Sequence, residues 1–93
     1  MEIMCVISDL VASRRIPGLS SSSLRVLADT KGKISVAVDP VGVPAGKWVF
    51  TAGGSAARIA TGDKSILTDL TICGIIDNWS AEETIIKASE NVN

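Results

Sequence analysis

Apolar and polar positions alternate along short stretches of this chain, which is the pattern of β-strands. The first stretch, residues 2–12, begins with two apolar faces: Ile3 and Cys5 lie on one, Met4 and Val6 on the other. A strand of this kind packs against a core on one side and against a neighbour on the other. The pattern therefore predicts a strand that is covered on both faces.

Four further strands are predicted, at residues 24–29, 34–39, 47–52 and 70–77. The short turn at residues 30–33 makes the first two of these a hairpin. Trp48 and Phe50 share one face of the strand at 47–52, and we expect this aromatic face to anchor the core. The last strand is apolar on both faces, which indicates a central or interfacial position.

A short helix is expected between the fourth and fifth strands. Gly53 and Gly54 open it, Ser55 is a good N-cap residue, and Gly62 is placed to end it. Five strands and one helix predict an all-β fold, a small closed or nearly closed barrel, because closure leaves no free strand edge.

One domain is expected over residues 1–79, followed by a C-terminal tail over residues 80–93. Ser80 and Glu83 have the spacing of a capping box. The tail carries few apolar residues, so it is expected to form a short or frayed helix with a loose end.

The composition holds more apolar surface than one small core readily absorbs. Of the 93 residues, 46% are hydrophobic and only 3% are aromatic, and the mean hydropathy is +0.36. A chain of this length buries only about 60% of its unfolded surface, and large exposed apolar patches are rare on monomers. The excess suggests burial between subunits. A compact, unusually apolar monomer is the alternative.

Nucleic acid and membrane partners are not expected. Nine basic and ten acidic residues are interspersed, so no basic block is available to bind a phosphate backbone. The longest apolar runs, at residues 3–7 and 72–76, are far shorter than the roughly 20 residues of a membrane-spanning helix. The N-terminus lacks signal-peptide features, which indicates a cytoplasmic protein. Cys5 and Cys73 are then expected as small core residues without a disulfide.

Catalytic chemistry is missing from the sequence. There is no histidine, and a nucleophile elbow would require glycine where Ala57 stands, so Ser55 is interpreted as a helix cap. Asp39, Asp69 and Asp77 could form a carboxylate cluster, but each follows or flanks a strand, where aspartate commonly binds local backbone amides. We expect no enzyme, no metal site and no cofactor.

One feature allows a ligand. The backbone N–H groups at Gly53 and Gly54, before a helix, favour anions weakly, and copies arranged around a symmetry axis would add their fields. Arg58 lies one turn into this helix and is expected to pair with a carboxylate or with a neighbouring subunit.

Four segments follow one another through the centre of the chain: residues 36–42, 46–49, 53–58 and 69–77. In order and spacing they resemble the pentameric vertex proteins of bacterial microcompartment shells, the carboxysome and ethanolamine-utilisation vertex family. Residues 15–18 and 24–27 are similar to the alpha-carboxysome branch, particularly to the second of its two paralogues.

The resemblance implies an oligonucleotide-binding-like (OB-like) five-stranded barrel that forms homopentamers. These would close the five-fold corners of an icosahedral carboxysome shell tiled by hexameric proteins, for carbon fixation in a cyanobacterium or a chemoautotrophic bacterium. Gly53, Gly54 and Ser55 match the family's segment before the short helix, and we expect them to lie at a pore on the five-fold axis or at an anion contact. Structural or intersubunit roles are assigned to seven positions in the four segments: Asp39, Gly42, Gly46, Arg58, Asp69, Gly74 and Asp77.

The alternative function is an OB-like binding module for single-stranded nucleic acid or a small ligand. Such a module should carry a basic groove with interleaved aromatic side chains. The chain offers only Trp48, Phe50 and Trp79 as aromatics.

Overall fold

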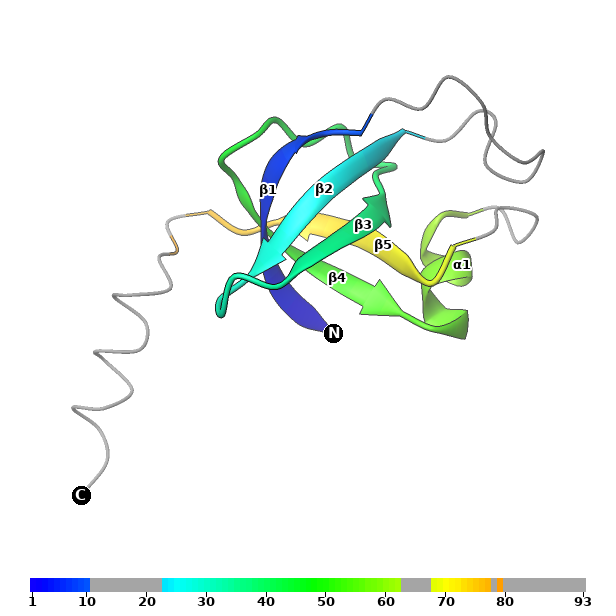
Figure 1. Ribbon diagram of the computed structural model, residues 1–93. Helices are drawn as coiled ribbons and strands as arrows, with labels where there is room; N and C mark the ends of the chain where they lie inside the picture. The colour runs from blue at the N-terminus through cyan, green and yellow to red at the C-terminus, as the bar shows by residue number, and fades with distance from the viewer. Residues whose placement is uncertain (11–22, 63–67, 78, 80–93) are drawn as a thin grey trace.

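The computed structural model describes residues 1–10, 23–62, 68–77 and 79, and the structural statements below concern these residues. The elements follow the predicted order (Figure 1): β1 Glu2–Asp9, β2 Leu24–Asp29, β3 Ile34–Val38, β4 Trp48–Gly53, α1 Ser55–Ala60 and β5 Leu70–Ile75. The fifth strand ends two residues earlier than predicted. The proposed tail at 80–93 and the predicted end of the first strand lie outside the described residues.

The five strands form a closed barrel in the order β1-β2-β3-β5-β4, which confirms the predicted fold class. Neighbouring strands are antiparallel except β3 and β5, which are parallel and meet at one bridging pair, Val38 with Thr71. The barrel is therefore closed most weakly between β3 and β5. The helix α1 packs against β4 and β5 at one end of the barrel (Figure 1).

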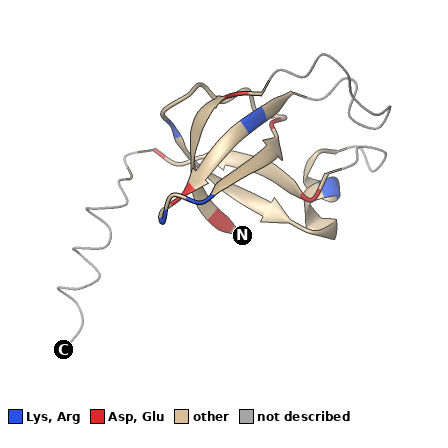
Figure 2. Cartoon of the chain, in the orientation of Figure 1, with Lys and Arg blue, Asp and Glu red and all other residues tan. Residues whose placement is uncertain are grey.

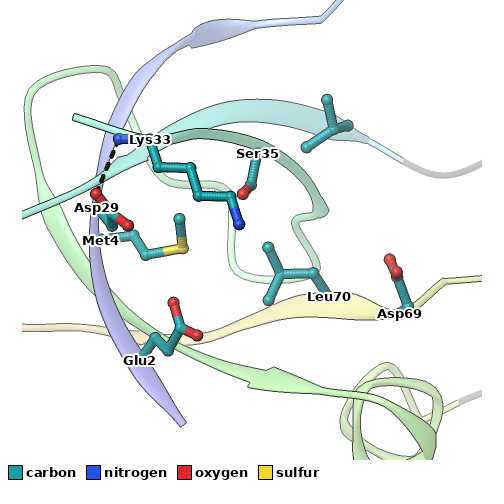
Figure 3. Close-up of a pocket in the computed structure, with 8 residues that line it drawn as sticks. Glu2, Met4, Asp29, Lys33, Ser35, Asp69 and Leu70 are labelled. Carbon is teal, nitrogen blue, oxygen red and sulfur yellow. Dashed lines mark hydrogen bonds between the residues drawn. The ribbon is translucent and has the colours of Figure 1, made fainter. Parts of the chain in front are cut away.

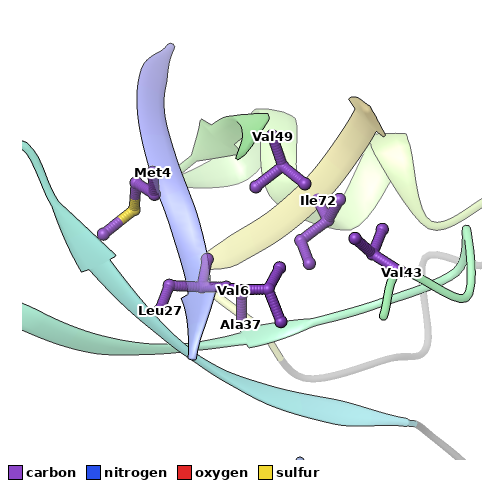
Figure 4. Close-up of a cluster of buried hydrophobic side chains, with 7 residues drawn as sticks. All are labelled: Met4, Val6, Leu27, Ala37, Val43, Val49 and Ile72. Carbon is purple, nitrogen blue, oxygen red and sulfur yellow. The ribbon is translucent and has the colours of Figure 1, made fainter. Parts of the chain in front are cut away.

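The core consists of aliphatic side chains that point to the barrel axis from all five strands and from the loop between β3 and β4. They are Met4, Val6, Leu27, Ala37, Val43, Val49 and Ile72, and all are almost completely buried (Figure 4). The interior of a small barrel is just wide enough for side chains of this size to fill.

The expectation that Trp48 and Phe50 anchor the core was wrong. Val49, which lies between them, is fully buried, whereas Phe50 is 37% exposed on the outside of the barrel. Phe50 lies opposite Gly74 on β5 and its ring covers that residue: a Cβ atom at Gly74 would lie 2.6 Å from Phe50 Cε1. The narrow interior takes the smaller valine, and the aromatic ring packs on the outer surface against Gly74.

The helix begins with a different cap from the predicted one. Gly54, not Ser55, is the N-cap residue, and no side chain caps the helix. Gly54 has a φ of +61°, a conformation that glycine adopts readily, and its N–H donates to the carbonyl of Asp69 at 3.0 Å. Gly62 follows the helix as predicted, and its N–H donates to Ile59 O.

Both cysteines are free thiols, as expected, but neither belongs to the core. Cys5 and Cys73 are half-buried. Cys5 lies on the outer side of β1, between the inward-pointing Met4 and Val6. Partial burial raises the pKa of the Cys5 thiol, because desolvation disfavours the thiolate.

Candidate functional site

Most of the outward-pointing side chains on β3, β2, β1 and β4 are apolar. Cross-strand partners point to the same face of a sheet. The pairing therefore aligns Ile34 with Ala28, Cys5 and Trp48 in one row around the barrel. The same pairing joins Val36 to Val26, and Ile3 to Phe50. We call this surface the outer apolar band; it consists of Ile3, Cys5, Val26, Ala28, Ile34, Val36, Trp48 and Phe50.

The two ends of the band are the most exposed parts of it. On β3, Ile34 is 60% and Val36 45% exposed; on β1 and β4, Ile3 is 38% and Phe50 37% exposed. The middle of the band, on β2, is half-buried. In a monomer both ends of the band would be exposed to water, which is unusual for a small soluble domain.

The loop after β3 is held by Asp39, one of the predicted structural residues. Its buried carboxylate accepts hydrogen bonds from the backbone N–H groups of Val41, Gly42 and Val43, at 2.9, 2.8 and 2.7 Å. Gly42 has a φ of +87°, which this turn requires. The arrangement brings Val43 into the core, so Asp39 acts locally on the backbone, as its position after a strand suggested.

Sequence reasoning missed the partner of Asp39, which is Arg25 on β2. The Arg25 Nε atom lies 3.1 Å from Asp39 Oδ2 and 3.3 Å from Asp9 Oδ1, and it donates to the Val43 carbonyl at 3.2 Å. The Asp39 side chain is fully buried and that of Arg25 is 17% exposed. The available signal was a charged residue inside the otherwise apolar strand at 24–28.

Gly46 also has a local structural role. It has a φ of +91°, and its N–H donates to Val6 O at 2.8 Å, while Val6 N–H donates to Lys47 O at 2.9 Å. These two bonds fasten the loop between β3 and β4 to β1.

The remaining predicted positions lie on the surface, and of these the fold joins the segment at Gly53 and Gly54 to Asp69 through the Gly54 N–H bond to the Asp69 carbonyl. Gly53, Gly54, Ser55, Arg58, Asp69 and Asp77 are all exposed. Among the described residues Arg58 has no ion-pair partner, so its expected intersubunit contact stays a prediction. The five-fold position of Gly53, Gly54 and Ser55 also stays a prediction. The helix that follows them, α1, has only six residues, so its dipole would attract an anion only weakly.

The carboxylates do not form a metal site. Asp39 is buried beside Arg25, whereas Asp69 and Asp77 are exposed, and the described residues contain no group of three metal-binding side chains. No helix in the described part of the chain has the length and apolarity to cross a membrane.

A hollow of about 520 Å³ opens where β3 diverges from β5 (Figure 3). Its lining residues are Glu2, Met4, Asp29, Lys33, Ser35, Val36, Asp69 and Leu70. Glu2 extends into it from β1, and Lys33 from the turn before β3 (Figure 3). Three carboxylates and one lysine make this hollow a poor match for a nucleic-acid backbone.

The charges elsewhere give no better groove. Lysine and arginine are spread over separate elements of the described chain (Figure 2). Asp29, at the rim of the hollow, accepts hydrogen bonds from the N–H groups of Lys33 and Lys31, which together lower the pKa of its carboxyl, the Lys33 bond most. The binding-module alternative therefore finds no basic groove with interleaved aromatics in the described residues.

Comparison with known proteins gives one consistent family. The family described as "Ethanolamine utilisation protein EutN/carboxysome" matches residues 1–77. The carboxysome shell vertex protein CsoS4B of Halothiobacillus neapolitanus is 67% identical over 79 residues, covering 85% of this chain and 98% of the relative. The vertex protein CsoS4A of the same organism is 46% identical over 83 residues, covering 88% of this chain and 100% of the relative.

Solved structures agree. The structure of CsoS4B from Halothiobacillus neapolitanus superposes with a TM-score of 0.79 at 68% identity, covering 83% of this chain and 99% of that chain. The pentameric microcompartment shell protein GrpN from Rhodospirillum rubrum gives 0.73 at 30% identity, covering 87% and 99%. The resemblance seen in the sequence is confirmed, including the similarity to the alpha-carboxysome branch. The family consists of structural shell proteins and not of enzymes. The chain belongs to this EutN/carboxysome family of microcompartment shell vertex proteins.

Proposed function

We propose that this chain assembles as a homopentamer that occupies the five-fold corners of a carboxysome shell and contacts hexameric shell proteins along its rim. Likeness over almost the full length of a carboxysome vertex protein carries the proposal. The similarity to a shell protein described as pentameric supports the copy number. The outer apolar band supplies a physical reason for assembly, because a ring of copies removes its exposed ends from water.

The function is geometric. Hexagonal tiles alone form flat sheets, and a closed shell needs corners where five tiles meet. A cyclic assembly of five copies has the symmetry of such a corner. The hollow, the free cysteines and the buried ion pair are then features of a building block, with no substrate to bind.

The first test is the copy number. Native mass spectrometry or sedimentation of the purified chain is expected to give five copies. A stable monomer at micromolar concentration contradicts the proposal.

The second test is in the cell. Deleting this chain together with any paralogue is expected to leave shells that form but are elongated or leaky, with growth that depends on high carbon dioxide while Rubisco stays active. Electron microscopy of the deletion strain decides the point. Regular, sealed polyhedra together with normal growth in air would contradict a role in closure.

A further inference from the structure

The outer apolar band lies on the wall of the barrel and leaves the two ends of the barrel uncovered. Because β1, β3 and β5 run opposite to β2 and β4, the loop between β3 and β4 lies at one end and α1 at the other (Figure 1). The six residues of β4 separate them by about 20 Å. We call residues 40–46 the mouth loop. Contacts between barrel walls in the proposed ring leave this loop accessible to another partner.

The mouth loop is held in one shape by contacts at both of its ends. Asp39 accepts hydrogen bonds from three of its N–H groups, Val43 is buried in the core, and Gly46 N–H donates to Val6 O. Both ion pairs between described residues involve Arg25, which also donates to Val43 O. A buried ion pair adds little net stability compared with apolar residues, so the main effect of this one is to fix the loop. A loop that is already ordered loses little entropy when a partner binds.

The exposed surface of the mouth loop is apolar and rich in hydrogen-bond acceptors. Its exposed side chains come from Pro40, Val41, Pro44 and Ala45, and Val41 is 45% exposed. The carbonyl groups of these four residues and of Gly42 accept no hydrogen bond from the described residues. Among the N–H groups of the loop, only that of Ala45 lacks an acceptor in the described part of the chain. A partner that binds here therefore has to supply donors together with an apolar contact.

The surroundings of the mouth loop are slightly acidic. The Asp9 side chain is 71% exposed. Asp77 is exposed at the same end of the barrel, where Ile76 N–H donates to Trp48 O. The described residues at this end include three carboxylates and two cations, namely Asp9, Asp39 and Asp77 with Arg25 and Lys47. Free carbonyls and a net negative charge together favour arginine or lysine side chains, because charged donors form the stronger hydrogen bonds.

We propose that the mouth loop is where the pentamer contacts a hexameric shell protein, whose edge presents arginine or lysine side chains to the loop carbonyls and an apolar side chain to Val41. The proposal rests on the function proposed above and identifies the surface that meets the hexamers. It also uses the predicted five-fold position of Gly53, Gly54 and Ser55. With these residues around the axis, β4 extends outward from them and carries the mouth loop to the perimeter of the ring, where hexamers adjoin it (Figure 1).

A charge at Val41 tests this contact. Val41→Lys places an ammonium group against the basic edge of the hexamer, and Val41→Glu places a carboxylate at the same position. Ile59→Lys is the matched control, because Ile59 is 66% exposed on α1, at the opposite end of the barrel. Native mass spectrometry is first expected to give five copies for the unmodified chain and for each variant. Where Val41→Lys does not assemble, Ala45→Lys and Ala45→Glu replace the pair, since Ala45 is also exposed on the loop.

Incorporation into shells provides the measurement. Each form is co-expressed with the hexameric shell protein of the same host, the shells are purified, and quantitative mass spectrometry gives the ratio of this chain to the hexameric protein. Val41→Lys is expected to lower the ratio by about tenfold, because like charges across an interface are strongly unfavourable. Val41→Glu is expected to stay within about twofold of the unmodified chain, because a new ion pair offsets the lost apolar contact. Ile59→Lys is expected to leave the ratio unchanged.

The outcomes separate this contact from the function on which it rests. Normal incorporation of pentameric Val41→Lys would overturn the mouth loop as the contact and leave the pentamer intact. Losses that are equal for Val41→Lys and Val41→Glu, or larger for Val41→Glu, would overturn the basic character of the partner and therefore the proposal as stated. A monomeric unmodified chain would overturn the pentamer itself.

Discussion

The inner and outer faces of β1 are both apolar, but the inner face is buried and the outer face is exposed. Met4 and Val6 point inward and are 2% and 1% exposed, whereas Ile3 and Ile7 point outward and are 38% and 49% exposed. Burial of the inner pair stabilises the barrel of a single copy. The outer pair contributes little until another surface covers it, and in the proposed pentamer that surface would be a neighbouring copy. On this account one strand contributes to folding with its inner face and to the proposed assembly with its outer face.

The largest effect is expected from removing the buried carboxylate of Asp39, the polar anchor of the loop after β3. Asp39→Ala removes the acceptor of three backbone N–H groups and leaves the Arg25 guanidinium without its buried partner. Loss of one member of a buried ion pair typically costs about 3–5 kcal/mol. Denaturant unfolding at fixed protein concentration measures the loss. A variant within about 1 kcal/mol of the unmodified chain would show that the anchor is dispensable, since 1 kcal/mol is typical of an ordinary mutation.

A matched pair of truncations tests the comparison directly. Leu27→Ala on the inner face should lower the free energy of unfolding by about 2–5 kcal/mol, because Leu27 is fully buried. Ile34→Ala on the outer face should leave the fold of a single copy unchanged and weaken assembly. Unfolding is compared at protein concentrations where both variants are monomeric, since subunit binding itself adds stability. Equal losses would contradict the division between the faces.

A smaller effect is expected at the contact between Phe50 and Gly74. Gly74→Ala places a Cβ atom 2.6 Å from Phe50 Cε1, so the ring must move. Overpacking of this kind costs about 1–3 kcal/mol, and the displaced ring should also weaken the pentamer. Adding Phe50→Leu to Gly74→Ala should restore stability, because a smaller side chain leaves room for the Cβ. No recovery in thermal unfolding of the double variant would argue against this contact.

The smallest expected effect is the pH dependence from Asp29. Hydrogen bonds from the N–H groups of Lys33 and Lys31 lower the pKa of Asp29 in the folded state. A lowered folded pKa stabilises the protein above the unfolded value of about 3.9, and this contribution is lost as the pH falls through the folded pKa. Unfolding free energies of the unmodified chain and Asp29→Asn should therefore differ at neutral pH and converge in acid. A difference that persists in acid would contradict this cause.

The sequence predicted the strands, the helix position and the barrel, because alternation, turn residues and glycine placement are local signals. It did not predict which face of each strand points inward. Both faces of the first strand are apolar, so the alternation identifies a strand but does not show which face points into the barrel. On the fourth strand, the aromatic side chains suggested the wrong face as the inward one. The narrow interior decides in favour of Val49 over Phe50.

Two features of the structure, the ion pair of Arg25 with Asp39 and the cap of α1, depend on tertiary contacts and could not be predicted from the sequence. The pairing of Arg25 with Asp39 forms only when β2 and the loop after β3 come together, and no spacing rule connects these residues. The helix cap at Gly54 depends on the Asp69 carbonyl, which arrives from the segment before β5. Ser55 matched the local cap preference, but the backbone bond to Asp69 fixed the helix start one residue earlier.

Hydrogen exchange at Ile34 and Val36 of β3 tests the central claim most directly, namely that a neighbouring copy buries the outer apolar band. Asp39 N–H donates to Ser23 O and Asp29 N–H donates to Lys33 O, so the alternation of an antiparallel ladder points the amides of Ile34 and Val36 away from β2. Neither residue has a ladder partner on β5. In the assembled protein these amides should exchange slowly. In an Ile3→Lys variant, which places a charge in the outer apolar band and should prevent assembly, they should exchange fast, while the Leu27 amide stays protected in both. Fast exchange of Ile34 and Val36 in a confirmed pentamer would contradict the account.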